Sequence, residues 1–229
     1  TGSYNTAYGI YGLFSNTTGF GNVTVGGGGL FYNTNGNYNT ALGYNAFING
    51  TSFSNSTSVG YASDITASNQ ARIGNSSVSS IGGYTNWSNL SDGRFKKDIQ
   101  ENVKGLEFIT KLRPVTYHLD IHKLNGFLYQ KDTIKFDEEA IADREAELQS
   151  GFIAQEVEAT AKQIGYDFSG VDKPKNEHDH YGLRYAEFVV PLVKAVQELN
   201  ATNEKLQNQS LAQQKINEEL PIQLNYICT

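Results

Sequence analysis

The sequence predicts a mixed fold: an N-terminal β-solenoid or β-roll of short repeats, then an α+β domain that ends in a long coiled-coil-like helix. Three observations predict it. A short pattern recurs at constant spacing near the N-terminus, charge is distributed unevenly along the chain, and apolar residues recur in heptads near the C-terminus. Short fixed repeats are typical of solenoids, and apolar heptads are typical of coiled coils.

The N-terminal repeat is an N-x-x-x-G pattern. Its copies are Asn5-Thr-Ala-Tyr-Gly9, Asn22-Val-Thr-Val-Gly26, Asn39-Thr-Ala-Leu-Gly43 and, with serine in the first position, Ser56-Thr-Ser-Val-Gly60. Leu13, Leu30 and Phe47 keep the same 17-residue step. Each coil of a solenoid buries its apolar residues against the next coil, so we expect short strands and tight turns. A disordered Gly/Asn-rich tract is the alternative, and the constant spacing argues against it.

Charge divides the chain near residue 90. Residues 1–90 contain two charged side chains, Asp64 and Arg72, whereas residues 91–229 contain 23 acidic and 17 basic ones. We therefore predict four segments: repeats over 1–62, a β-rich junction over 63–90, a charged α+β domain over 91–200, and a C-terminal helix and tail over 201–229.

Composition also argues against several classes of function. The acidic pI and the lack of a Lys/Arg cluster argue against nucleic-acid binding. A single cysteine, Cys228, excludes an internal disulfide and a cysteine zinc site. His178-Asp-His180 has no third ligand at suitable spacing, so we expect a polar loop, no metal and no cofactor. No apolar stretch is long enough for membrane insertion, and the absence of methionine suggests a piece of a longer protein.

The C-terminal helix carries an a/d heptad seam whose apolar character fades after Leu206. Its two positions are Val189, Val196, Asn203 and Ser210, and Leu192, Leu199, Leu206 and Gln213. Upstream, we expect a helix over 103–112 that Pro114 ends, and a buried strand that begins at Phe152 and Ile153. The charged stretch 137–148 predicts an exposed acidic helix capped by Asp137.

The segment Asn39-Thr-Ala-Leu-Gly-Tyr-Asn-Ala46 resembles the head repeats of trimeric autotransporter adhesins. This resemblance covers about residues 1–62. It implies left-handed β-rolls, with three chains side by side.

Four motifs after residue 90 occur in one order: Ser91-Asp-Gly-Arg-Phe-Lys96, Leu112-Arg-Pro-Val-Thr-Tyr117, Gly151-Phe-Ile-Ala-Gln-Glu-Val157, and Tyr185 followed by Val189-Val-Pro-Leu-Val193. Together they resemble the C-terminal intramolecular chaperone domain of phage endosialidases and tail fibres, and they extend over the predicted domain 91–200. The chain departs from that family in a charged insertion at about 120–148 and in the tail from Pro221 to Thr229. Related domains occur in bacterial surface proteins and in a myelin transcription factor.

The resemblance implies cleavage of the chain's own Leu90–Ser91 bond by a serine–lysine dyad, a single-turnover serine endopeptidase activity. Ser91 matches the nucleophile and Lys96 the base, with Lys97 as a minor alternative. Asp92 and Arg94 are supporting candidates. Glu156 either supports the site or satisfies a buried helix start.

Spacing limits how the dyad can form. Five residues along a helix turn the chain by about 140° away from a shared face, and along a strand they point to opposite sides. The pair can therefore meet only if the chain bends near Gly93, or if Lys96 comes from another protomer. A lysine base must also lose its proton, so burial or a neighbouring cation has to lower its pKa from about 10.4.

The leading hypothesis is an intramolecular chaperone that trimerises, folds a β-structured fibre and then releases itself at Leu90–Ser91. Its partners would be two further copies of itself and the parent adhesin, tail fibre or tail spike as client. This places it outside the cell, on a cell surface or a virion tail fibre. The alternative is a non-cleaving structural trimerisation tip of an adhesin. A DNA-associated, membrane-released factor is a third possibility, disfavoured because no basic segment is present.

Overall fold

A computed structural model describes residues 2–130 and 134–227 of the 229-residue chain. The chain forms two compact units. The first contains residues 1–90, 115–151 and 173–181, and the second contains residues 91–114, 152–172 and 182–229. The chain therefore leaves the first unit and returns to it twice.

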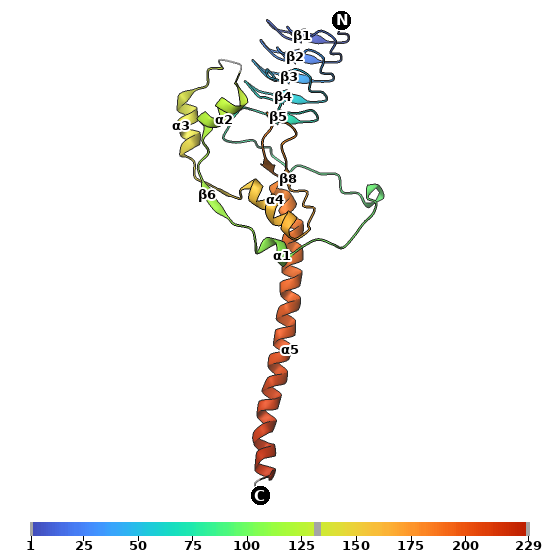
Figure 1. Cartoon of the computed structure of the whole chain (residues 1–229), viewed down its shortest axis with the longest axis vertical. Coiled ribbons are helices and arrows are strands. Elements are labelled where there is room, and N and C mark those ends of the chain that lie inside the picture. The colour runs from blue at the N-terminus through green and yellow to red at the C-terminus, as the bar shows by residue number, and fades with distance from the viewer. Residues whose placement is uncertain (1, 131–133, 228–229) are drawn as a thin grey trace. The chain divides into compact units, whose positions relative to one another are not determined.

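The N-terminal part of the first unit is a parallel β-solenoid, as predicted. Five short strands, each one coil apart, form one sheet in the order of the sequence (Figure 1). They are β1 Thr6–Tyr8, β2 Val23–Val25, β3 Thr40–Leu42, β4 Thr57–Val59 and β5 Ala71–Ile73. The register is in phase with the sequence repeat, since Ala7 pairs with Thr24 and Thr24 pairs with Ala41.

The glycine that ends each repeat is required by the backbone. Gly26 and Gly43 have φ angles of +127° and +135°, which L side chains rarely adopt. A Cβ on Gly43 would also lie 2.5 Å from the carbonyl oxygen of Gly60 in the next coil. The glycine column thus permits both the turn and the close stacking of coils.

The asparagine that starts each repeat forms a buried ladder. The side-chain oxygen of Asn5 accepts from the backbone N–H of Asn22, that of Asn22 from Asn39, and that of Asn39 from Ser56, at 2.9 to 3.1 Å. Asn22 and Asn39 are fully buried. These hydrogen bonds explain why an amide recurs at this position, because a buried backbone N–H needs a partner.

The regular step ends at the last coil. Val25 pairs with Leu42 and Leu42 with Val59, but Val59 pairs with Ile73, so the last step is shorter than the others. Thr66 and Ala67 are buried in this final coil, and Leu30, Ala41, Phe47 and Ile65 belong to the apolar core inside the solenoid.

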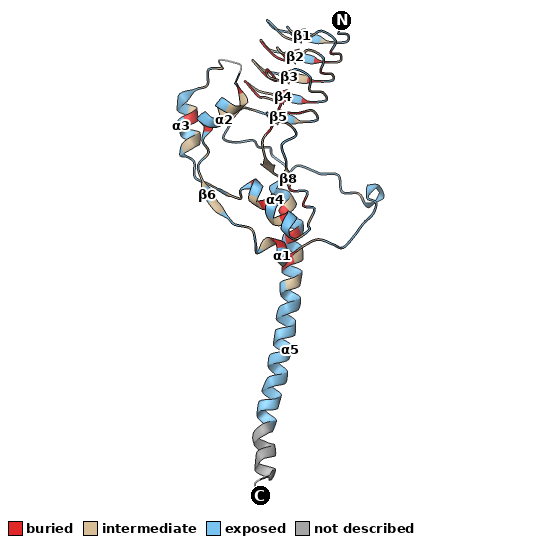
Figure 2. Ribbon diagram, viewed as in Figure 1, coloured by how far each residue is buried: buried red, intermediate tan, exposed pale blue. Residues whose placement is uncertain are grey.

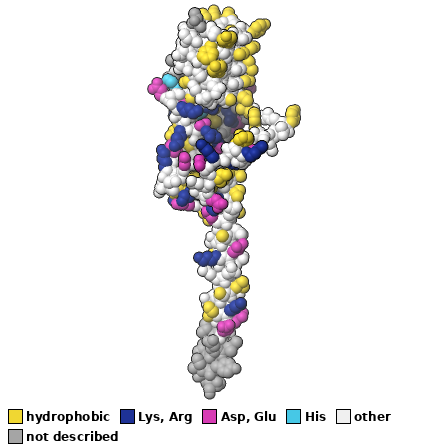
Figure 3. Space-filling model, turned by 90° about the vertical axis from the view of Figure 1, so that its right-hand side faces the viewer, with side chains coloured by type: hydrophobic (Ala, Val, Ile, Leu, Met, Phe, Trp, Pro, Cys, Tyr) yellow, Lys and Arg dark blue, Asp and Glu magenta, His cyan; other side chains and the backbone are white. Residues whose placement is uncertain are grey.

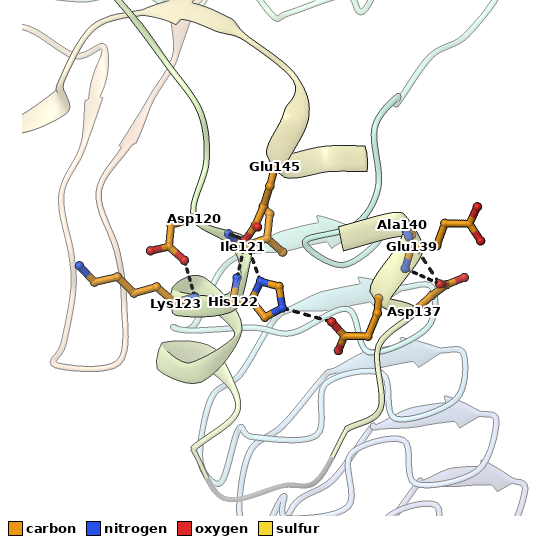
Figure 4. Close-up of polar contacts among 9 residues, drawn as sticks. Asp120, Ile121, His122, Lys123, Asp137, Glu139, Ala140 and Glu145 are labelled. Carbon is orange, nitrogen blue, oxygen red and sulfur yellow. Dashed lines mark hydrogen bonds and ion pairs between the residues drawn. The ribbon is translucent and has the colours of Figure 1, made fainter. Parts of the chain in front are cut away.

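The inserted segment belongs to the first unit. It comprises β6 Val115–Tyr117, α2 Ile121–Leu128, α3 Glu138–Ala146 and β7 Gln149–Gly151, with β6 and β7 antiparallel. Asp137 caps α3 by accepting from the N–H groups of Glu139 and Ala140, which confirms that prediction (Figure 4).

The second unit is built on an aromatic core. Its elements are a 3-10 helix Gly93–Phe95, α1 Leu106–Ile109, α4 Ala154–Gln163, β8 Val171–Asp172, β9 Gly182–Leu183, a 3-10 helix Tyr185–Phe188 and α5 Val189–Ile227. Phe108, Phe168 and Phe188 pack with Val157 and Ala161 at its centre.

Two local predictions in this unit are wrong. The helix expected over 103–112 is only the short α1; the Glu198 carboxylate of α5 accepts from the Leu106 N–H at its start. No strand begins at Phe152: β7 precedes it, and Ile153 caps α4, because the chain must turn there to bury Ala154 and Val157.

The long C-terminal helix is confirmed as α5. Beyond Ala195 its described side chains are mostly exposed (Figure 2). Cys228 and the end of the predicted tail lie outside the described residues. Among the described residues, no helix is both long and apolar enough to cross a membrane.

Candidate functional site

Ser91 and Lys96 meet within one chain. The Nζ of Lys96 donates to the Oγ of Ser91 at 3.0 Å. Of the two routes that the spacing left open, a bend near Gly93 is therefore the one present. A contact between protomers is not needed to bring these two atoms together.

The bend is the 3-10 helix Gly93–Phe95. The Asp92 carbonyl accepts from the Phe95 N–H, and the Gly93 carbonyl accepts from the Lys96 N–H, both at 3.1 Å. The Asp92 side chain caps this turn by accepting from the Arg94 N–H at 2.9 Å. Asp92 and Lys96, on either side of this single turn, have extended backbone conformations, so the chain changes direction within the three residues between them.

Asp92 and Arg94 support the turn through each other. The Arg94 guanidinium binds the Asp92 carboxylate at 2.6 Å and lies over the Phe95 ring. The hydrogen bonds from the Arg94 side chain and backbone lower the pKa of the Asp92 carboxyl, which keeps it ionised as a cap. Their contacts indicate a structural role in holding the bend.

The dyad is open to solvent. Ser91, Arg94, Lys96 and the preceding Leu90 are all exposed, Leu90 by 82%. In the observed contact the lysine is the hydrogen donor, whereas a general base must accept the serine proton. Ser91 Oγ and Lys96 Nζ are therefore within hydrogen-bond distance, in the arrangement that precedes transfer of the serine proton to the lysine.

Glu156 is bound elsewhere in the second unit. Its carboxylate accepts from the guanidinium of Arg113 in a two-pronged ion pair, which lowers the pKa of Glu156. Glu156 lies in the first turn of α4 and is exposed to an intermediate degree. The described contacts tie α4 to the segment before Pro114.

Sequence reasoning missed a polar cluster in the inserted segment. His122 lies in α2 and contacts Glu145 at 2.9 Å (Figure 4). It also contacts Glu138 at 3.2 Å. Glu145 also accepts from the N–H groups of Ile121 and His122. Hydrogen bonds to Glu145 and Glu138 raise the pKa of His122. These contacts join α2 to α3 and stabilise the charged form of His122.

The His178–His180 segment is a polar loop centred on a buried aspartate. Asp179 is only 7% exposed and accepts from the N–H groups of Lys175 and His180. Within residues 2–130 and 134–227, no group of three or more His, Cys, Asp or Glu side chains is placed to hold a metal ion.

The comparisons with known proteins support the resemblance that rests on the four motifs after residue 90. Residues 91–166, about a third of the chain, match the model of a peptidase family described as "Chaperone of endosialidase". No curated protein and no solved structure matches the chain. The resemblance to this family is confirmed for the matched residues, and the match begins at Ser91 itself. The family supports an intramolecular chaperone role and implies a self-cleaving serine peptidase kind of activity.

Proposed function

We propose that the chain is an intramolecular chaperone that assembles three copies, supports folding of the β-solenoid and then cuts its own Leu90–Ser91 bond. The observation that carries the cleavage step is the 3.0 Å contact between Lys96 Nζ and Ser91 Oγ, at the first residue of the family match. The client is the solenoid and the fibre of which it is part, either a phage tail fibre or a surface adhesin.

The proposed reaction uses Ser91 as its nucleophile. Lys96 removes the hydroxyl proton, Oγ attacks the carbonyl carbon of Leu90, and the Leu90–Ser91 C–N bond breaks as the nitrogen takes up the proton. Water then hydrolyses the ester between Leu90 and the Ser91 Oγ, which gives a Leu90 carboxylate and restores the Ser91 hydroxyl on a residue whose amine is already free. Backbone N–H groups are the better oxyanion donors, because the Arg94 guanidinium is engaged by Asp92.

Cleavage requires a change in the surroundings of the dyad. A lysine accepts a proton near neutral pH only when burial or another cation lowers its pKa from about 10.4. Ser91 and Lys96 are exposed in the single chain. A surface of a neighbouring protomer would supply the burial, and cleavage would then follow assembly.

Two exposed apolar features support association of copies. The α5 seam exposes Val189, Leu192, Val196, Leu199 and Leu206, each by 45% or more. A helix that extends so far without packing gains its stability from partners. In the solenoid, the third residue of each strand forms a stacked column in which Tyr8, Val25, Leu42 and Ile73 are exposed.

A denaturing gel of the purified full chain tests the cleavage. We expect two fragments, 1–90 and 91–229, with Ser91 as the new N-terminus. Ser91→Ala and Lys96→Met should both leave the chain whole, and the matched changes Ser88→Ala and Lys97→Met should not. Cleavage that survives Ser91→Ala would overturn the nucleophile. Loss of cleavage in Lys97→Met alone would show that Lys97, and not Lys96, is the general base.

A second candidate function is a trimerisation tip that stays covalently attached. The exposure of the dyad favours it, since an exposed lysine lacks the environment of a base. Light scattering measures the mass of the assembly, and a denaturing gel of the same sample shows whether its chains are cut. A trimeric mass with uncut chains after prolonged incubation establishes the tip, whereas a trimeric mass with cut chains establishes the self-cleaving chaperone.

A further inference from the structure

The first compact unit spans the proposed scissile bond. Residues 1–90 precede this bond, and residues 115–151 and 173–181 follow it, yet all three segments pack as one body. Cutting between Leu90 and Ser91 removes one covalent link and leaves these contacts in place. The contacts fall into two groups, which we call the first arm (residues 118–130 and 134–148) and the second arm (residues 173–181).

The first arm buries aromatic residues against the last coils. Tyr129 is 7% exposed and packs in a cluster with Ile48 and Ala62 of the solenoid. Its hydroxyl donates to the Ala62 carbonyl at 2.5 Å. Burial raises the pKa of Tyr129, so this hydroxyl keeps its proton and remains a donor. Phe136 makes edge-to-face contact with Tyr61.

Side chains of the solenoid also donate hydrogen bonds to backbone carbonyls of the first arm. The side-chain amide of Asn49 donates to the Leu128 carbonyl at 2.9 Å, and the Tyr61 hydroxyl donates to the Lys135 carbonyl at 2.6 Å. These two bonds hold the backbone of the arm on either side of Tyr129 against side chains of the solenoid. The brace between His122 and its two glutamates holds α2, which leads into Tyr129, against α3.

The second arm holds one residue of the final coil from two sides. The buried Asp179 carboxylate accepts from the Thr66 hydroxyl at 2.6 Å, and the Asn176 amide donates to the Thr66 carbonyl at 2.8 Å. Burial would raise the pKa of Asp179, but the hydrogen bonds from Thr66, Lys175 and His180 lower it overall. A buried carboxylate without these donors would be costly, so the contact is selective.

Each arm contacts a residue of the final coils that differs from the residue at the same position of the preceding repeat. Thr66 lies in the shortened last coil, between β4 and β5, where the constant step of the repeat is lost. Tyr61 repeats Tyr44, but the position one repeat before Ala62 is Asn45, so the alanine that packs with Tyr129 is absent from the preceding coil. An interior coil would therefore present a different surface.

We propose that the two arms form a clamp for the terminal coils of the solenoid, and that this clamp retains the C-terminal fragment, 91–229, on its client after the backbone is cut. This clamp rests on the proposed chaperone role, since it defines the client surface, but it does not depend on self-cleavage. Covalent release and physical release then become separate events. The second event requires that Tyr129 and Asp179 leave their sites.

The test uses a full chain that cannot cut itself. In Ser91→Ala, the exposed stretch 84–90 is replaced by the recognition sequence of a site-specific protease, the chain is folded, and the protease is added. Native gel filtration then shows whether the N-terminal and C-terminal fragments travel together. We expect co-elution, and separation when Tyr129→Ala and Asp179→Ala are both present. Separation of the cut parent chain would overturn the clamp.

Matched changes keep the result interpretable. Phe95→Ala with Asp167→Ala removes an exposed aromatic and an exposed carboxylate outside the arms, and the cut fragments should still co-elute. The gentler pair Tyr129→Phe with Asp179→Asn removes hydrogen-bonding groups and little volume. We expect it to speed dissociation by about tenfold, equivalent to about 1.4 kcal/mol. An unchanged dissociation rate in this pair would overturn the assigned contacts, whether or not the unmodified chain cleaves itself.

Discussion

The solenoid and the second compact unit stabilise themselves in different ways. The solenoid contains two charged residues and satisfies its interior with backbone ladders, buried asparagines and glycines that let coils approach. The second unit has an aromatic core around Phe108, and salt bridges on its surface. Figure 3 shows the difference on one face: hydrophobic side chains line the solenoid, and Lys, Arg, Asp and Glu lie almost entirely on the rest of the chain.

This difference indicates which contacts each region needs before it can fold. A coil of the solenoid gains its hydrogen bonds only when a neighbouring coil is already in place, so the first coil is costly to form. The second unit closes contacts between elements of its own, such as α1 and α5. A unit with its own aromatic core, joined to a repeat whose first coil is costly to form, is consistent with the proposed intramolecular chaperone.

The largest expected effect comes from the glycine column. Gly43→Ala places a Cβ 2.5 Å from the Gly60 carbonyl oxygen at a φ angle of +135°. Backbone strain and overpacking each cost about 1–3 kcal/mol, so we expect a loss of up to about 6 kcal/mol in the free energy of unfolding of the first unit. Urea unfolding followed by circular dichroism measures this loss.

The control for Gly43 is Gly126 in α2, where an added Cβ meets nothing within 4 Å. Gly126→Ala should be neutral or stabilise the helix by up to about 1 kcal/mol. If both substitutions have the same effect, close stacking of the coils is not the reason for the glycine column.

In the second unit, the corresponding destabilising substitution is in the aromatic core. Phe108 is fully buried against Phe168 and Phe188. Phe108→Ala should therefore cost about 3–5 kcal/mol, measured by thermal unfolding. Phe95→Ala, at a side chain that is 70% exposed, is the control and should change little. A small effect at Phe108 would contradict the central role of this aromatic core in the second unit.

The asparagine ladder should respond more moderately. Asn39→Ala removes the acceptor of the Ser56 N–H and a donor to the Phe53 carbonyl. Each buried group left without a partner costs about 1–3 kcal/mol. Asn35→Ala, at an exposed amide of the same coil, should have almost no effect on urea unfolding. Equal losses for the two would show that burial of the ladder is unimportant.

The smallest expected effect is a pH dependence of the inserted segment. The pKa of His122 is raised, so its ion pairs contribute stability below its unfolded pKa of about 6.5, and this contribution is lost as the pH rises through the higher folded value. The melting temperature of the first unit should fall over that range. His122→Gln should remove this part of the pH dependence, and His118→Gln should leave it in place.

Most of the fold followed from local pattern. The constant step of the repeat predicted the solenoid because coil stacking repeats the same backbone geometry, and Asp137 predicted the start of α3 because helix capping is a short-range interaction. The strand at Phe152 and the long helix before Pro114 were predicted wrongly, since short apolar runs have the same pattern in helices, strands and loops.

The candidate site was also predicted only in part from the sequence. The sequence by itself determined the residue types at Ser91 and Lys96, the position of the charge boundary and the need for a bend near Gly93. Only the tertiary structure decided that this bend forms within one chain, and that residues 115–151 and 173–181 return to pack with the solenoid. The reason is physical: a turn or a repeat is encoded over a few residues. Contacts such as Tyr129 with Ala62 and Asp179 with Thr66 join parts of the chain that are far apart in sequence, and no local pattern records such a pairing.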